Sequence, residues 1–188
     1  LIMEENLTQE ESLIKRIVIC GPESTGKTTM INNLAVYFQT NYVDEFARDF
    51  LQKKWDSKKE ICSKEDLIQI AKGQIKAENT NIKNSNKLIF CDTNILTTLA
   101  WSRTHFDEFC DPWLEKQSKL LKYDYYLILN TEIPWVKDDL RDRPKDRKKM
   151  FLAHKKELDN LNVDYDIIDD SDFEKRFNQA VEYIKNKY

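Results

Sequence analysis

The amino-acid sequence predicts an α/β domain in which a mainly parallel sheet carries helices on both faces. Short apolar runs alternate along the chain with longer helical stretches, the pattern of parallel strands joined by crossover helices. The chain has 188 residues, of which 40% are hydrophobic, so it suits one domain with a real core and is too short for two comfortable ones. Ligands of such sheets gather at the carboxyl ends of the strands.

The first expected strand is an apolar run that leads into a glycine turn, and the first expected helix follows that turn. Three of the five expected strands, Ile17–Cys20, Leu88–Cys91 and Tyr125–Leu129, are short apolar runs, and the other two, Asn41–Asp44 and Tyr165–Ile168, mix apolar and polar residues. Helices are expected at Lys27–Phe38, Phe46–Trp55, Asp66–Asn79, Ile95–Arg103, Trp113–Lys122, Lys145–Leu161 and Phe173–Asn186. Two helix starts carry the pattern of a capping box, Ser63 with Asp66 and Ser171 with Glu174.

Composition argues against several classes of protein. The formal net charge is −3, so the chain lacks the basic surplus of nucleic-acid-binding proteins. No apolar run approaches the ~20 residues that span a bilayer, and no signal-peptide pattern is present, so we expect a cytoplasmic protein. The 4 cysteines lack C-x-x-C spacing and are expected to be reduced. Residues 1–14 are polar and predict a flexible tail before one domain at residues 15–188.

The segment 17–29, IVICGPESTGKTT, contains the pattern G-x-x-x-x-G-K-[ST] between an expected strand and an expected helix. In such a loop backbone N–H groups surround phosphate oxygens, the lysine reaches the β- and γ-phosphates, and the threonine hydroxyl ligates Mg²⁺. The alternative is a glycine turn with a solvated lysine, and the complete, correctly framed motif argues against it. We therefore expect ATP and Mg²⁺ as cofactors, held by Gly21, Glu23, Ser24, Thr25, Gly26, Lys27, Thr28 and Thr29, with Lys27 also catalytic.

Two further stretches favour phosphoryl transfer over hydrolysis. Gly73 is the only glycine outside the P-loop, and Ile70 stands three residues before it. The D-x-x-G switch of GTPases is therefore missing, which argues against a GTPase. The strand LIFCDT ends in Asp92, which is well placed for Mg²⁺, but Thr93 follows where hydrolytic ATPases have glutamate. The alternative role for Asp92 is a helix cap at the end of the strand.

A kinase also needs a carboxylate near the hydroxyl of its acceptor. Glu45 directly follows the second expected strand and could take or align the hydroxyl proton, with Arg48 one helical turn further on to hold the substrate. A surface ion pair between the same two residues is the alternative.

The segment WVKDDLRDRPKDRKKM, 135–150, places arginines after the fourth expected strand. Arg141, Arg143 and Arg147 could close over ATP as a lid and stabilise charge on the transferred phosphoryl group, with Arg141 and Arg147 catalytic and Arg143 on the nucleotide. The alternative is that these arginines form a basic, solvated helix face, for which a similar sequence is expected.

Together these motifs resemble the ribosylnicotinamide kinase domain of the NadR type, a family of P-loop ATPases. The matching stretches are GPESTGKTT (21–29), DEFARDF (44–50), IAKGQIKAE (70–78), FCDTNILTT (90–98) and TEIPWVKDDLRDRPKDR (131–147). The resemblance implies a P-loop kinase-like three-layer α/β/α fold with a five-stranded parallel sheet. It also implies ATP-dependent phosphorylation of the ribose 5′-hydroxyl of nicotinamide riboside, giving nicotinamide mononucleotide for NAD synthesis.

The chain departs from that family in two places. No H-x-G-H motif of an adenylyltransferase is present, so kinase activity alone is expected. Asp139 stands where the lid of the family often has glycine.

The acceptor that the resemblance implies carries a cationic pyridinium, which an aromatic face can hold. Trp101 is the expected stacking residue, with Phe46 and Tyr42 behind it, and Gln74 is a weaker substrate contact. A core tryptophan is the alternative. A kinase for another nucleoside or vitamin alcohol, and a regulatory ATP-binding module without an acceptor, are the other functions considered. The sequence does not choose between ATP and GTP or fix an oligomeric state.

Overall fold

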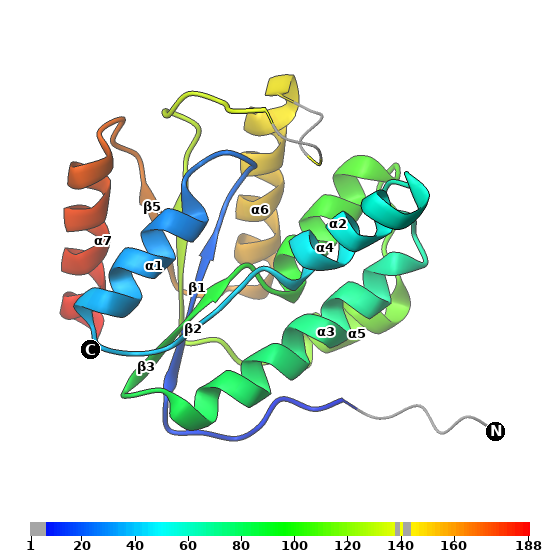
Figure 1. Ribbon diagram of the computed structural model, residues 1–188. Coiled ribbons are helices and arrows are strands. Elements are labelled where there is room, and N and C mark those ends of the chain that lie inside the picture. Colours follow the sequence, from blue (N-terminus) through cyan, green and yellow to red (C-terminus); the bar gives the residue numbers. More distant parts are fainter. Residues whose placement is uncertain (1–6, 138–139, 141–143) are drawn as a thin grey trace.

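A five-stranded parallel sheet forms the centre of the molecule, as the computed structural model in Figure 1 shows. The structure describes residues 7–137, 140 and 144–188. The strand order is β2-β3-β1-β4-β5. The strands are β1 (Lys15–Cys20), β2 (Tyr42–Val43), β3 (Leu88–Asp92), β4 (Tyr125–Leu129) and β5 (Tyr165–Ile168). Because β1 lies between β3 and β4, the loop after β1 is flanked by the ends of two neighbouring strands.

Seven α-helices surround the sheet in the described part of the chain. They are α1 (Lys27–Tyr37), α2 (Phe46–Lys58), α3 (Asp66–Asn81), α4 (Ile95–His105), α5 (Pro112–Leu120), α6 (Arg147–Leu161) and α7 (Phe173–Lys187). Short 3₁₀ turns, η1 (Ile82–Asn84) and η2 (Pro144–Asp146), follow α3 and precede α6. Helices α1 and α7 cover one face of the sheet, whereas α3, α4, α5 and α6 cover the other.

The alternation of side chains along β1 divides the core between the two faces. Ile17 and Ile19 pack with residues of α1 and α7, while Val18 and Cys20 pack with residues of α3 to α6. All four are at most 2% exposed. Such two-sided burial is expected of a central strand in a parallel sheet covered by helices, and it explains why the predicted strands are continuous apolar runs.

The predicted fold class is confirmed, with differences at the ends of elements. Strand β2 is only two residues long, and α2 extends three residues beyond the predicted end at Trp55. At α3, the Ser63 N–H donates to the Asp66 carboxylate at 2.7 Å, which is one half of the predicted capping box. At α7 the prediction that Ser171 caps the helix is wrong. The side chain of Asp172 caps it instead, by accepting from the Lys175 N–H at 2.9 Å.

The described residues of the N-terminal segment, 7–14, run along the sheet end opposite the P-loop (Figure 1). The Glu10 N–H donates to the Asn79 side chain at 2.8 Å, and that side chain donates to the Thr8 carbonyl at 2.8 Å. The boundary between tail and domain stays a prediction. All four cysteines are free, as predicted, and burial raises the pKa of Cys20 to about 12. No helix in the described residues is long and apolar enough to cross a membrane.

Candidate active site

The loop between β1 and α1 can hold its shape only with glycine at two positions. Gly21 has φ 137°, and a Cβ there would lie 2.5 Å from the Leu129 carbonyl oxygen at the end of β4. Gly26 has φ 81° and precedes α1, whose N-terminus has no side-chain cap. The backbone N–H groups of the first turn of α1 therefore stay available to an anion, which the helix dipole also favours.

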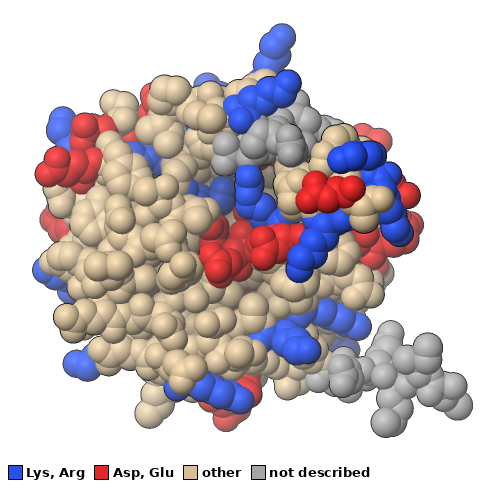
Figure 2. Space-filling model, viewed as in Figure 1, with Lys and Arg blue, Asp and Glu red and all other residues tan. Residues whose placement is uncertain are grey.

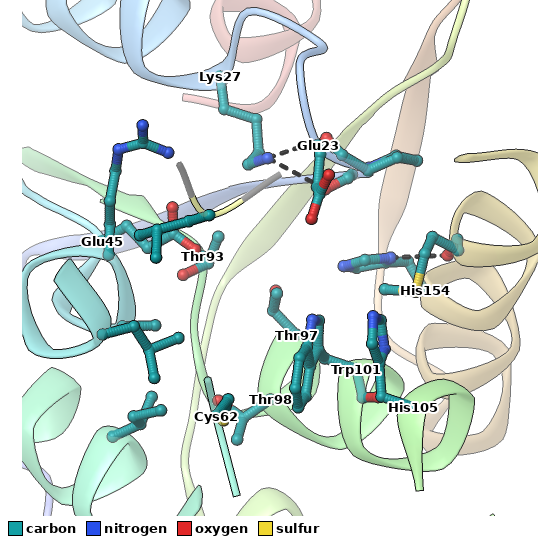
Figure 3. A pocket seen from close by; sticks show the side chains of 18 of the residues that line it. Glu23, Lys27, Glu45, Cys62, Thr93, Thr97, Thr98, Trp101, His105 and His154 are labelled. Carbon is teal, nitrogen blue, oxygen red and sulfur yellow. Dashed lines mark hydrogen bonds between the residues drawn. The ribbon is translucent and has the colours of Figure 1, made fainter. Parts of the chain in front are cut away.

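Lys27 begins α1 and turns back over the loop. Its Nζ donates to the carbonyls of Gly21 at 3.1 Å and Pro22 at 3.0 Å, as the dashed lines in Figure 3 show. The Thr25 hydroxyl donates to the same Pro22 carbonyl at 2.9 Å, which braces the loop from the inside. The ammonium group thus lies inside the curve of the loop, where phosphate oxygens would be held.

Asp92, the last residue of β3, lies beside the hydroxyl of Thr28. The Thr28 Oγ1 donates to Asp92 Oδ2 at 2.8 Å, whereas Asp92 Oδ1 is buried without a hydrogen-bond partner in the described part of the chain. Burial, and secondly the charge of Glu45, raise the pKa of Asp92 to about 7, against the opposing effect of Lys27. A carboxylate that is buried and has one free oxygen is suited to a cation.

Thr93 holds an unusual backbone conformation directly after Asp92. Its φ is 65°, a region that β-branched residues rarely adopt, and its N–H donates to the Ile19 carbonyl at 3.0 Å. Backbone strain of this kind is concentrated at functional sites. The strained turn ends β3 and fixes the position from which the Asp92 side chain projects.

A cavity of about 770 Å³ opens from the P-loop towards α2, α4 and α6. Lys27 and Glu23 lie on one side of it, Glu45 on a second, and Trp101, His105 and His154 on the side away from Lys27 (Figure 3). Carboxylates and basic side chains both line it. Figure 2 shows the same mixture on the surface, where acidic side chains gather in the middle of the viewed face beside basic ones.

Glu45 stands at the N-cap of α2 and lines the cavity, as the prediction of an acceptor-side carboxylate requires. Arg48 lines the same cavity. Gln74, predicted as a substrate contact, is 3% exposed, and its Oε1 accepts from the Phe46 N–H at 3.0 Å. Gln74 also lines the cavity, so it both faces the site and anchors the residue next to Glu45.

Trp101 lies on α4 in the cavity wall, but its neighbours differ from those predicted. Its ring stacks on His105 with centroids 3.9 Å apart and planes at 12°, and Phe106 meets it edge-on. Phe46 instead packs over Gly73 of α3, and Tyr42 packs against the core beneath α1 and α7. The prediction that Phe46 and Tyr42 stand behind Trp101 is therefore wrong, because the pleat of β2 directs Tyr42 to the opposite face of the sheet.

Arg147 connects the segment after β4 to the P-loop. Its guanidinium donates to the Ile133 carbonyl at 2.9 Å and to the Ser24 carbonyl at 3.1 Å, and burial lowers its pKa. The Val136 N–H donates to Ser24 Oγ at 2.8 Å. Arg141, Arg143 and Asp139 lie outside the described residues, so their predicted roles in a lid stay predictions.

Several polar residues of the cavity wall were not predicted from the sequence, among them Glu60, His105 and His154. Thr97, Trp101 and His105 recur every four residues along α4, so they share one helix face. That spacing was a readable signal for His105. No sequence pattern indicated His154, because its position in the cavity wall depends on how α6 packs against α4.

The sheet order, the P-loop and the carboxylate at the end of β3 define a P-loop nucleotide-binding protein with a kinase-like α/β fold. The model of the AAA_28 family, described as an AAA domain, matches residues 16–176, so the chain belongs to this family.

Curated relatives agree with the predicted resemblance to NadR. The chain is 27% identical over 174 residues to the trifunctional NAD biosynthesis/regulator protein NadR of Escherichia coli (strain K12), a match over 92% of this chain and 42% of that protein. It is 28% identical over the same shares to NadR of Salmonella typhimurium. The chain therefore spans about two fifths of the length of these relatives.

Solved structures show the same fold at low sequence identity. A NadR protein in complex with NR superposes with a TM-score of 0.79 at 20% identity, covering 93% of this chain and 49% of that chain. The thymidylate kinase from Ehrlichia chaffeensis gives a TM-score of 0.61 at 12% identity, covering 90% of this chain and 98% of that one. Both confirm the predicted kinase-like arrangement of the sheet and helices.

Proposed function

We propose that the protein is an ATP-dependent small-molecule kinase that phosphorylates the ribose 5′-hydroxyl of nicotinamide riboside. The observation that carries this proposal is the shared cavity, which Lys27, Glu45 and Trp101 line from different sides. Thr28 also lines it and donates to Asp92, whose pKa burial and the charge of Glu45 raise. The names of the relatives support it, since one solved NadR structure contains NR and another contains NAD and AMP-PNP. The product would be nicotinamide mononucleotide.

The nucleotide half of the site fits Mg-ATP. Backbone N–H groups of the P-loop and the Lys27 ammonium would hold the β- and γ-phosphates. Thr28 and Asp92 would hold Mg²⁺, and the feature that fits a cation is Oδ1 of Asp92, which has no hydrogen-bond partner among the described residues. The described residues contain no cluster of three His, Cys, Asp or Glu side chains. Magnesium bound to ATP needs only one or two protein ligands, and it neutralises charge on the phosphates.

The acceptor half of the site is built around Glu45. Its carboxylate would accept the proton of the 5′-hydroxyl as that oxygen attacks the γ-phosphorus, and ADP leaves with the bridging oxygen. The effect of Glu45 on the pKa of Asp92 supports this placement, because a charge must be close to shift a neighbour. Arg48 would hold the acceptor or the transferred phosphoryl group.

Trp101 would hold the acceptor ring. One of its faces is covered by His105, while Thr98 and Cys62 lie towards its other side in Figure 3. A cationic pyridinium stacked on the uncovered side would gain a cation–π interaction of about 1–2 kcal/mol.

Acceptor-dependent ADP formation by the purified protein tests the proposal. Nicotinamide riboside should stimulate ADP release, whereas ATP alone should be hydrolysed slowly, since Thr93 follows Asp92 where hydrolytic ATPases have the glutamate that positions water. If another nucleoside or vitamin alcohol stimulates the reaction in its place, the kinase assignment holds and the substrate assignment fails. If no acceptor does, the protein is a regulatory ATP-binding module. The cytoplasmic location and the absence of nucleic-acid partners stay predictions.

A further inference from the structure

His154 is a buried polar residue of the cavity wall that the proposed chemistry leaves unused. It is 3% exposed, lies on α6 and lines the cavity. Its ring extends from α6 towards the cavity, on the same side as His105 and Trp101 (Figure 3). Because the ring is buried, each of its two nitrogens needs a hydrogen-bond partner, either a neighbouring protein atom or a ligand.

The hydrogen bond of Nδ1 fixes the tautomer of this histidine. His154 Nδ1 lies 2.8 Å from the Met150 carbonyl oxygen. A carbonyl can only accept, so Nδ1 carries the proton. In the neutral ring Nε2 is then an acceptor, and it is buried without a hydrogen-bond partner in the described part of the chain.

The surroundings keep the ring neutral. Burial lowers the pKa of His154 to about 4, with a smaller contribution from the positive charge of Lys27 and against the opposing effect of the hydrogen bond to Met150. Protonation would place a second N–H donor where the described residues supply no acceptor. At neutral pH the Nε2 atom of His154 therefore carries a lone pair of fixed direction, which can accept a hydrogen bond but not donate one.

We propose that His154 is a specificity-determining residue whose Nε2 accepts a hydrogen bond from a hydroxyl or amide N–H of the acceptor. The inference rests on the proposed kinase function and adds a requirement, that the acceptor must present a neutral donor at this wall. The P-loop and Asp92 account for the phosphates and the metal of the nucleotide, whereas His154 shares its side of the cavity with Trp101. An acceptor with a carboxylate at this position would place its negative charge against the Nε2 lone pair and would therefore bind weakly.

A matched pair of variants separates the acceptor role from packing. His154→Phe keeps a planar ring without an acceptor, and His154→Gln keeps an acceptor at the distal position. We expect His154→Phe to raise the KM for nicotinamide riboside about 5–50-fold, the cost of losing one buried hydrogen bond, and to leave the KM for ATP within about 2-fold. His154→Gln should stay within about 3-fold of the wild type for both.

Analogues identify the donor. Nicotinic acid riboside removes the amide N–H, and the 2′- and 3′-deoxy forms of nicotinamide riboside each remove one hydroxyl. The analogue that lacks the hydrogen-bond donor should bind the wild type more weakly than nicotinamide riboside does, by about the factor that His154→Phe costs. His154→Phe should weaken the binding of that analogue no further.

Nitrogen-15 NMR of the imidazoles supplies a readout that does not depend on turnover. The chain has 2 histidines, so one substitution assigns the spectrum of the untagged protein. The Nε2 of His154 should resonate as an unprotonated nitrogen at pH 7 and shift when nicotinamide riboside is added. A shift caused by ATP alone, a rise in the KM for ATP, or equal behaviour of His154→Phe and wild type would overturn the inference. Failure of the proposed function would instead be seen in the wild type, as ADP formation that nicotinamide riboside does not stimulate.

Discussion

Gly73→Ala tests whether the packing of α2 on α3 positions the carboxylate of Glu45, the proposed general base. A Cβ at position 73 would lie 2.1 Å from Cε1 and 2.2 Å from Cζ of the Phe46 ring. Carbon atoms normally approach to about 3.5–4.0 Å, so the ring would have to retreat by roughly 1.5 Å. Overpacking of this kind costs about 1–3 kcal/mol, and the helix propensity of alanine offsets roughly 1 kcal/mol of that cost.

We therefore expect Gly73→Ala to lower the free energy of unfolding by about 1 kcal/mol in urea denaturation. Phe46 is the first residue of α2 and directly follows Glu45. Its displacement should therefore lower kcat about 10–100-fold while the KM for ATP stays near the wild-type value.

The background Phe46→Ala supplies the control, because it removes the ring that alanine would strike. In that background Gly73→Ala should stabilise the protein by about 0.5–1 kcal/mol, the helix-propensity gain alone. The coupling between the two positions should thus change the sign of the effect. The reasoning is refuted if Gly73→Ala changes stability by the same amount in both backgrounds.

Substitutions at three further positions test other parts of the molecule. Asp92→Asn should lower kcat by about 10²–10³-fold and raise stability at pH 8, because it removes a buried charge whose pKa is raised to about 7; unchanged kcat would contradict a metal role. Gln74→Leu should lower kcat about 5–30-fold without changing the KM for ATP, because the Phe46 N–H loses its acceptor, whereas Gln74→Glu should retain more of the activity. Burial raises the pKa of Glu78 to about 7, so the protonated carboxyl stabilises the fold below about pH 4.5 and this contribution is lost as the pH rises through 7. Denaturation of Glu78→Gln from pH 4.5 to 8 should show the wild type losing about 3 kcal/mol relative to the variant, and parallel curves would be evidence against the shift.

The sequence predicted the features that depend on local pattern. The five strands, the P-loop and the placement of Glu45 and Asp92 after β2 and β3 follow from short apolar runs and the polar residues that end them. Parallel strands bring such ends to one edge of the sheet, which is why Glu45 lies close enough to Asp92 in the structure to raise its pKa.

Tertiary packing determined what the sequence did not reveal. The role of Gln74 as the anchor of Phe46 depends on α2 lying across α3, and the buried position of His154 depends on α6 lying beside α4. The helix cap of α7 was misplaced by one residue because Ser171 and Asp172 are both good capping residues, and only the backbone conformation decides between them.

Transfer of phosphate to nicotinamide riboside by wild type and Glu45→Gln tests the central claim most directly. Both proteins are incubated with ATP labelled at the γ-phosphate, and labelled nicotinamide mononucleotide is quantified over time. Glu45→Gln keeps the size of the side chain but removes the charge that can accept the proton, so the rate should fall by about 10²–10⁴-fold, with ATP binding nearly unchanged. Rapid labelling of the mononucleotide by wild type and its loss in Glu45→Gln is the predicted result. Equal rates in the two proteins, or no labelled mononucleotide from the wild type, would contradict the account.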